Sequence, residues 1–111
     1  MNISELATYL KLEILQETFE DGAVQGAYTS DLLSDVMANA HTADVLITIQ
    51  AHKNTVAVAT LVGASAIVVC NGRPVPPDMI DAARQEKIAV FLSDRDQFTI
   101  SGILYGLLHG E

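Results

Sequence analysis

Three of the six basic residues, Lys53, Arg73 and Arg95, lie in polar segments that directly follow apolar runs typical of β-strands. Cationic side chains and free N–H groups at helix N-termini are the groups that bind small anions. If these runs are parallel strands, their carboxyl ends share one edge of the sheet, where α/β proteins commonly bind ligands. The sequence therefore predicts a site for a small anionic ligand at this edge, such as a nucleotide or an acyl phosphate. The residues expected to line it are Tyr28, Ser30, Asp31, Gln50, His52, Asn54, Asn71, Arg73 and Ser93, of which Ser30, Asn54 and Ser93 would cap or expose helix amides.

The three histidines offer little support for catalysis. His41, His52 and His109 are far apart in the sequence, and their spacing assembles no triad. The chain has neither the Gly-x-Ser-x-Gly sequence of α/β-hydrolases nor the Gly-Lys pair of a P-loop. One enzymatic hypothesis stays open, in which His52 acts as an acid–base catalyst together with Asp31 or Asp94. We otherwise expect a protein that is not an enzyme, with no catalytic residue and no cofactor.

Two further features could form a metal, acid–base or thiol site, but a structural role explains each of them more simply. Asp31 and Asp35 have the i, i+4 spacing that brings two carboxylates together on a helix, but capping by Asp31 and solvation of Asp35 are the expected roles. Cys70 ends an apolar run and is expected to be a small buried side chain, not a reactive thiol. The sequence therefore predicts no metal site.

The elements that position these residues alternate along the chain. Such alternation predicts an α/β fold in which a mostly parallel sheet of about four to five strands has flanking helices. Strands are expected at 12–15, 45–49, 66–69 and 88–92, and helices begin near residues 4, 30, 54, 77 and 96. Ser30 or Asp31 is the expected N-cap of the second helix, Asn54 that of the third, and Gly63 its stop. The side chains expected to face inward from the second and last helices are Leu33, Val36, Met37, Ala40, Phe98, Ile100, Ile103, Leu104 and Leu107.

The expected helix at 54–62 has no polar face. A helix that is apolar on all sides must be buried on more than one side, either deep within the protomer or against a second copy. We expect a symmetric homodimer, because a chain of 111 residues has little interior. The predicted interface consists of Val56, Ala59, Thr60 and Leu61, and the helix that ends near residue 108 could share it through its spare apolar residues Tyr105 and Leu108.

Composition limits the class of protein. The length of 111 residues fits one domain, 1–111, and the net charge of −8 with no basic stripe argues against binding to nucleic acid. The uncharged segment 54–72 is long enough to cross a membrane, but its polar residues and two glycines favour a buried helix followed by a buried strand. A single cysteine excludes an internal disulfide, and the N-terminus lacks the pattern of a signal peptide, so we expect a cytoplasmic protein.

Three segments resemble the DRTGG-domain family in order along nearly the whole chain. They are 26–40 (GAYTSDLLSDVMANA), 48–59 (TIQAHKNTVAVA) and 67–76 (IVVCNGRPVP). The name-giving Asp-Arg-x-x-x-Gly-Gly motif is incomplete, because residues 21–27 contain no arginine and only one of the paired glycines.

The resemblance implies a fold similar to the N-terminal domain of HPr kinase/phosphorylase and a regulatory or accessory role. Members of the family occur beside CBS domains, within phosphate acetyltransferases and as small separate proteins, some encoded near iron-only hydrogenases. Ligand sensing is the usual suggestion for them. An alternative is an adaptor that binds a partner enzyme of metabolism or redox chemistry, such as a hydrogenase.

Overall fold

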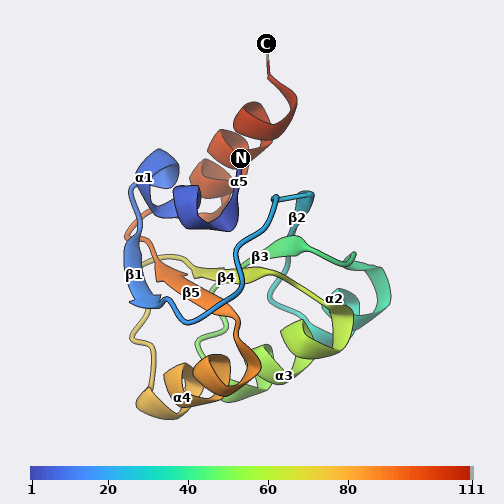
Figure 1. Cartoon of the computed structure of the whole chain (residues 1–111), viewed down its shortest axis with the longest axis vertical. Coiled ribbons are helices and arrows are strands. Elements are labelled where there is room, and N and C mark those ends of the chain that lie inside the picture. Colours follow the sequence, from blue (N-terminus) through green and yellow to red (C-terminus); the bar gives the residue numbers. More distant parts are fainter. Residues whose placement is uncertain (111) are drawn as a thin grey trace.

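A β-sheet forms the middle of three layers, with helices on both of its faces (Figure 1). The computed structural model describes residues 1–110. The elements are η1 (Ile3–Glu5), α1 (Leu6–Leu10), β1 (Glu13–Gln16), β2 (Gly26–Thr29), α2 (Leu33–Asn39), β3 (Asp44–Thr48), α3 (Lys53–Val62), β4 (Ala66–Val69), α4 (Pro77–Glu86), β5 (Ala89–Leu92) and α5 (Gln97–His109).

All five strands belong to one sheet, in the order β1-β5-β4-β3-β2. Strands β2, β3, β4 and β5 are parallel, and β1 runs antiparallel beside β5. Parallel neighbours need a crossover connection, so one helix follows each of β2, β3 and β4. The expected α/β fold with a mostly parallel sheet and flanking helices is confirmed.

The strands present alternate side chains to two separate hydrophobic cores. Leu46 and Ile67 pack beneath α2, α3 and α4, whereas Ile47 and Val68 pack against α1 and α5 on the opposite face. The three crossover helices share one face because the parallel strands lie in sequence order and each crossover is right-handed. Only α5 crosses to the other face after β5 (Figure 1).

The predicted helix caps need two corrections. The N-cap of α3 is His52, whose Nδ1 accepts a hydrogen bond from the N–H of Asn54 at 3.0 Å, so the helix begins one residue earlier than expected. The N-cap of α2 is Leu32, because the side chain of Asp31 is hydrogen-bonded to β3 and α5 instead. The helix stop at Gly63 is confirmed, with a φ of 75° that favours glycine.

Three side chains that the helical pattern placed inside are exposed: Met37, Phe98 and Leu107. Helix α2 has seven residues, of which only Val36 is buried. Helix α5 rests on the sheet through Ile100 and Leu104, and Phe98 lies on a different side of that helix.

Helix α3 packs against α2 and α4 within the protomer. Val56 and Ala59 are 1% and 0% exposed, so these two residues of the predicted interface have no surface to offer a second copy. Thr60 and Leu61 are exposed. Much of α3 is therefore apolar because neighbouring helices of the same protomer bury it. This is the alternative that the sequence left open.

The uncharged segment 54–72 divides at Gly63 into most of α3 and the strand β4, as expected. Within residues 1–110, no helix combines the length and hydropathy required to cross a membrane.

Candidate functional site

The four parallel strands end along one side of the sheet, which we call the carboxyl edge. It consists of the links 30–32, 49–52, 70–76 and 93–96. Eight of the nine predicted ligand-binding residues lie in or beside these links, since the carboxyl ends of parallel strands lie on the same side of the sheet, whereas Tyr28 lies within β2. The convergence of the links therefore follows from the fold.

Asp31 is the centre of hydrogen bonding at this edge. Its Oδ1 accepts hydrogen bonds from the N–H of Ile49 at 2.8 Å, the hydroxyl of Thr48 at 3.0 Å and the side-chain amide of Gln97 at 2.9 Å. The amide of Gln50 donates to the backbone carbonyl of Asp31 at 3.0 Å. One carboxylate thus connects the ends of β2 and β3 to the start of α5, which is a structural role for a residue predicted to bind ligand.

The links after β4 and β5 are hydrogen-bonded to each other. The N–H groups of Asn71 and Gly72 donate to the carbonyls of Arg95 and Ser93 at 2.9 and 2.8 Å. The buried Ser93 hydroxyl accepts from the N–H of Arg95 at 3.0 Å. Both Asn71 and Gly72 have positive φ, so this contact depends on a tight left-handed turn. The structure brings Asn71 and Ser93 together, but their backbones fill the space between these links.

Tyr28 lies apart from the other predicted residues. It packs in the core beneath α2, where its hydroxyl donates to Asp35 at 2.8 Å. This hydrogen bond lowers the pKa of Asp35 and raises that of Tyr28. Asp35 also accepts from the side chain of Asn39 at 2.8 Å, so the carboxylates of Asp31 and Asp35 have different partners and do not form a pair.

The acid–base hypothesis for His52 lacks the geometry it requires. His52 is exposed, and its Nδ1 is occupied as the cap of α3. Among residues 1–110, no carboxylate forms a hydrogen bond or ion pair with it. Nor do these residues contain three His, Cys, Asp or Glu side chains grouped so that they could hold a metal ion.

The three cations of the carboxyl edge differ in availability. The guanidinium of Arg95 donates to the backbone carbonyl of Leu10 at the end of α1, so it is a structural group. Arg73 and Lys53 are exposed. Asp96 caps α5 by accepting from the N–H of Thr99 at 2.8 Å, which lowers the pKa of Asp96. The edge therefore carries carboxylates beside its free cations, and it attracts anions less than the sequence suggested.

Cys70 is completely buried at the end of β4. Burial, together with the negative charges of Asp31 and Asp96, raises the pKa of its thiol to about 11. At pH 8 about one thiol in a thousand is then ionised. We expect iodoacetamide to label the native protein far more slowly than the urea-unfolded protein, as measured by mass spectrometry. Equal labelling rates would show that Cys70 is accessible in the native state.

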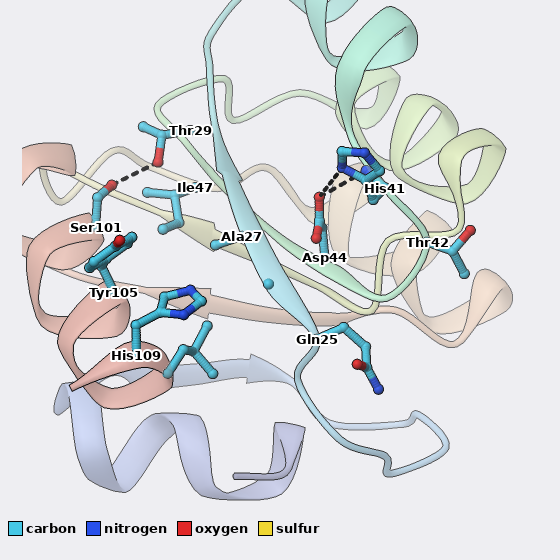
Figure 2. A pocket seen from close by; sticks show the side chains of 12 residues that line it. Gln25, Ala27, Thr29, His41, Thr42, Asp44, Ile47, Ser101, Tyr105 and His109 are labelled. Atoms are coloured by element: carbon cyan, nitrogen blue, oxygen red, sulfur yellow. Dashed lines mark hydrogen bonds and ion pairs between the residues drawn. The ribbon is translucent and has the colours of Figure 1, made fainter. Parts of the chain in front are cut away.

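A cavity runs along β2, between this edge strand and α5 (Figure 2). Its volume is about 480 Å³. Ser101, Tyr105 and His109 project into it from α5, and the hydroxyls of Ser101 and Thr29 share a hydrogen bond of 2.7 Å across its upper part (Figure 2). The lining residues are Gln25, Gly26, Ala27, Thr29, His41, Thr42, Asp44, Ile47, Ser101, Tyr105, Leu108 and His109.

The cavity offers mostly neutral polar groups and aromatic rings, together with the carboxylate of Asp44. Tyr105 and His109 lie with ring centroids 4.6 Å apart, and no lysine or arginine lines the space. The buried carboxylate of Asp44 accepts from the N–H of His41 at 2.8 Å. A Cβ at Gly26 would lie 2.9 Å from the Asp44 Oδ1, so glycine here lets β2 pass close to that carboxylate.

None of the nine predicted ligand-binding residues lines this cavity. Asn54 lines a second space of about 480 Å³, a groove between α3 and α4. No sequence pattern predicted the cavity, because its walls come from separate segments of the chain. A signal was available in the two uncharged stretches 22–30 and 97–108, which form β2 and most of α5.

The three-layer arrangement, with a mostly parallel sheet between helices, places this chain in the class of small α/β domains. One solved structure of this kind comprises the CBS and DRTGG domains of the regulatory region of Clostridium perfringens pyrophosphatase, in complex with its activator diadenosine tetraphosphate. The two folds match with a TM-score of 0.72 and 19% sequence identity over 92% of the present chain. The chain spans less than half of that structure, 45% of its length.

The comparison supports the expected DRTGG-like fold. No protein-family model matches the sequence, and no curated protein matches it. Membership of the family and the homodimer stay predictions.

Proposed function

We propose that this chain is a non-catalytic regulatory or accessory module that binds a small ligand of the nucleotide class and passes its binding state to an associated enzyme. The observation that carries the proposal is the cavity between β2 and α5. A volume of about 480 Å³ lies within the range of small-molecule sites.

The lining of the cavity suits the ring system of such a ligand. The exposed ring of Tyr105 offers a face for stacking, and the Gln25 amide and the hydroxyls of Thr29 and Ser101 offer hydrogen bonds. Because no lysine or arginine lines the cavity, the charged groups of an anionic ligand extend from it into solvent. The similar fold in a pyrophosphatase region that binds a dinucleotide activator supports the same class of ligand.

A second candidate is an adaptor that docks a metabolic or redox enzyme without binding a small ligand. The observation in its favour is the exposed side chain of Leu61 on α3, together with that of Leu32 before α2. Exposed apolar side chains such as these can contact a partner, and neither of them lines the cavity.

A thermal-shift screen against nucleotides, acyl phosphates and coenzyme A derivatives tests the proposal. A ligand held at 100 times its Kd is expected to stabilise the native state by about 2.7 kcal/mol. Ser101→Leu, which fills the cavity, is expected to abolish this shift. The matched control is Arg73→Ala at the carboxyl edge, which is expected to leave the shift unchanged.

Each contrary result has a distinct meaning. Loss of the thermal shift in Arg73→Ala but not in Ser101→Leu would place the ligand at the carboxyl edge and refute binding in the cavity. No shift with any compound would favour the adaptor.

A further inference from the structure

The two edges of the sheet differ in how they are protected from pairing with another strand. The edge strand β1 carries Glu13, is followed by Glu17, and has an irregular register against β5 between Ile14 and Gln16. Charge and irregularity are the devices that keep edge strands from associating. The edge strand β2 has neither, because Gly26–Thr29 pairs with β3 in regular register and contains no charged residue.

The outer side of β2 has free backbone groups. The N–H of Ser30 donates toward β3, to the carbonyl of Ile47 at 3.2 Å. In a parallel strand the direction of these groups alternates with each residue, so those of Ala27 and Thr29 point away from β3. The side chains of both residues are exposed. This edge is therefore open to a further strand.

A face of α5 continues this edge. Phe98, Ser101, Tyr105 and His109 recur at helical spacing, and the last three line the cavity beside β2 (Figure 2). Phe98 is 86% exposed and Tyr105 is 68% exposed. Residues 22–30 and 97–108, which supply most of this surface, contain no Asp, Glu, Lys or Arg, and His109 follows directly. We call this surface the β2–α5 face.

We propose that the β2–α5 face binds a second copy of this chain around a two-fold axis, with β2 pairing antiparallel to its counterpart and α5 packing beside its own. This proposal replaces the interface that the sequence predicted on α3 with one on the opposite face of the sheet. The proposal stands independently of the ligand class.

The distribution of charge favours a second copy over a basic partner at this face. Each protomer carries a net charge of −8, so two copies repel each other unless they meet where charges are absent. The β2–α5 face provides this, whereas a basic partner would be attracted to the acidic surfaces elsewhere. Helix α5 has 13 residues and is about 20 Å long, so its exposed side chains extend along this surface beside the strand edge.

Sedimentation velocity across a concentration series tests the proposal. The wild-type chain is expected to sediment as a dimer of the 11.9 kDa protomer. Phe98→Glu and Tyr105→Glu are each expected to weaken dimerisation by about 30-fold or more, because each places a charge within the apolar contact. Both side chains are exposed in the protomer, so circular dichroism should show unchanged folding.

Leu61→Glu is the matched control, since it adds the same charge at a side chain that is 72% exposed on α3. It is expected to leave the dimer intact. A wild-type protein that stays monomeric throughout the series overturns the proposal. So does a dimer that separates in Leu61→Glu but persists in Phe98→Glu and Tyr105→Glu.

Amide hydrogen exchange gives a readout that needs no variant. In the dimer the N–H groups of Ala27 and Thr29 are expected to exchange slowly, because pairing with the second β2 protects them. Rapid exchange of both amides in a dimeric sample would refute the strand pairing.

Discussion

Replacing Asp31 with alanine is expected to lower the free energy of unfolding by about 3 kcal/mol, the largest loss that we expect from a polar substitution at the carboxyl edge. The Oδ1 atom accepts three hydrogen bonds, and two of their donors, the Ile49 N–H and the Thr48 hydroxyl, belong to the end of β3. Thr48 is completely buried, so its hydroxyl loses a partner that water replaces poorly.

For a chain of this size, a loss of about 3 kcal/mol lowers Tm by roughly 12 °C or more, which a calorimetric or circular-dichroism melt measures directly. Asp31→Asn is expected to cost less than Asp31→Ala, because the amide retains one oxygen acceptor but loses the charge.

Asp94→Ala is the matched control for this prediction. Asp94 is an exposed aspartate in another link of the same edge, and its carboxylate accepts no hydrogen bond within residues 1–110. Its removal is expected to change stability by no more than about 0.5 kcal/mol. Equal melting temperatures for Asp31→Ala and Asp94→Ala would refute the central role of Asp31.

Gln16→Glu is expected to destabilise the protein by about 3 kcal/mol, although the two side chains have the same shape. The buried Gln16 amide nitrogen donates to the carbonyls of Ile88 at 2.8 Å and Thr18 at 3.0 Å, and its Oε1 accepts from the Thr18 N–H at 2.7 Å. In the variant a carboxylate oxygen faces two carbonyl oxygens, so two attractive contacts become repulsive.

Urea unfolding followed by circular dichroism measures this loss. Gln85→Glu makes the same chemical change at an exposed position on α4 and is expected to have an effect within about 0.5 kcal/mol. A Gln16→Glu protein as stable as the Gln85→Glu protein would show that the buried amide does not hold the β1 edge in place.

For the predicted ligand site, the sequence indicates where the links lie but not which partners their side chains bind. The strand-to-helix links do meet at one edge, and that follows from alternating apolar runs. The sequence did not reveal that Asp31 would bind Gln97, a partner 66 positions away. The pattern therefore predicted that the polar residues of the links bind a ligand, although several of them are hydrogen-bonded to one another.

The predicted interface failed in part for a similar reason. The pattern of residues 54–62 correctly indicated a helix that needs cover on more than one side. The pattern did not specify what supplies the cover, and in the structure α2, α4 and the sheet bury Val56 and Ala59. Apolar side chains such as Phe98 on α5 were expected to be buried but are exposed. The helical periodicity indicates which side of a helix faces the core, but not how far around the helix that covered side extends.

The sequence by itself determined the local properties of this protein: the apolar runs that form four of the five strands, most of the helices, the turn at Gly63 and the acidic charge. These depend on neighbouring residues, through backbone preference and side-chain periodicity. Only the tertiary structure decided that β1 lies antiparallel beside β5, that α5 crosses to the opposite face, and that β2 and α5 enclose a cavity. Such arrangements depend on contacts between distant segments, whose free energies no local pattern contains.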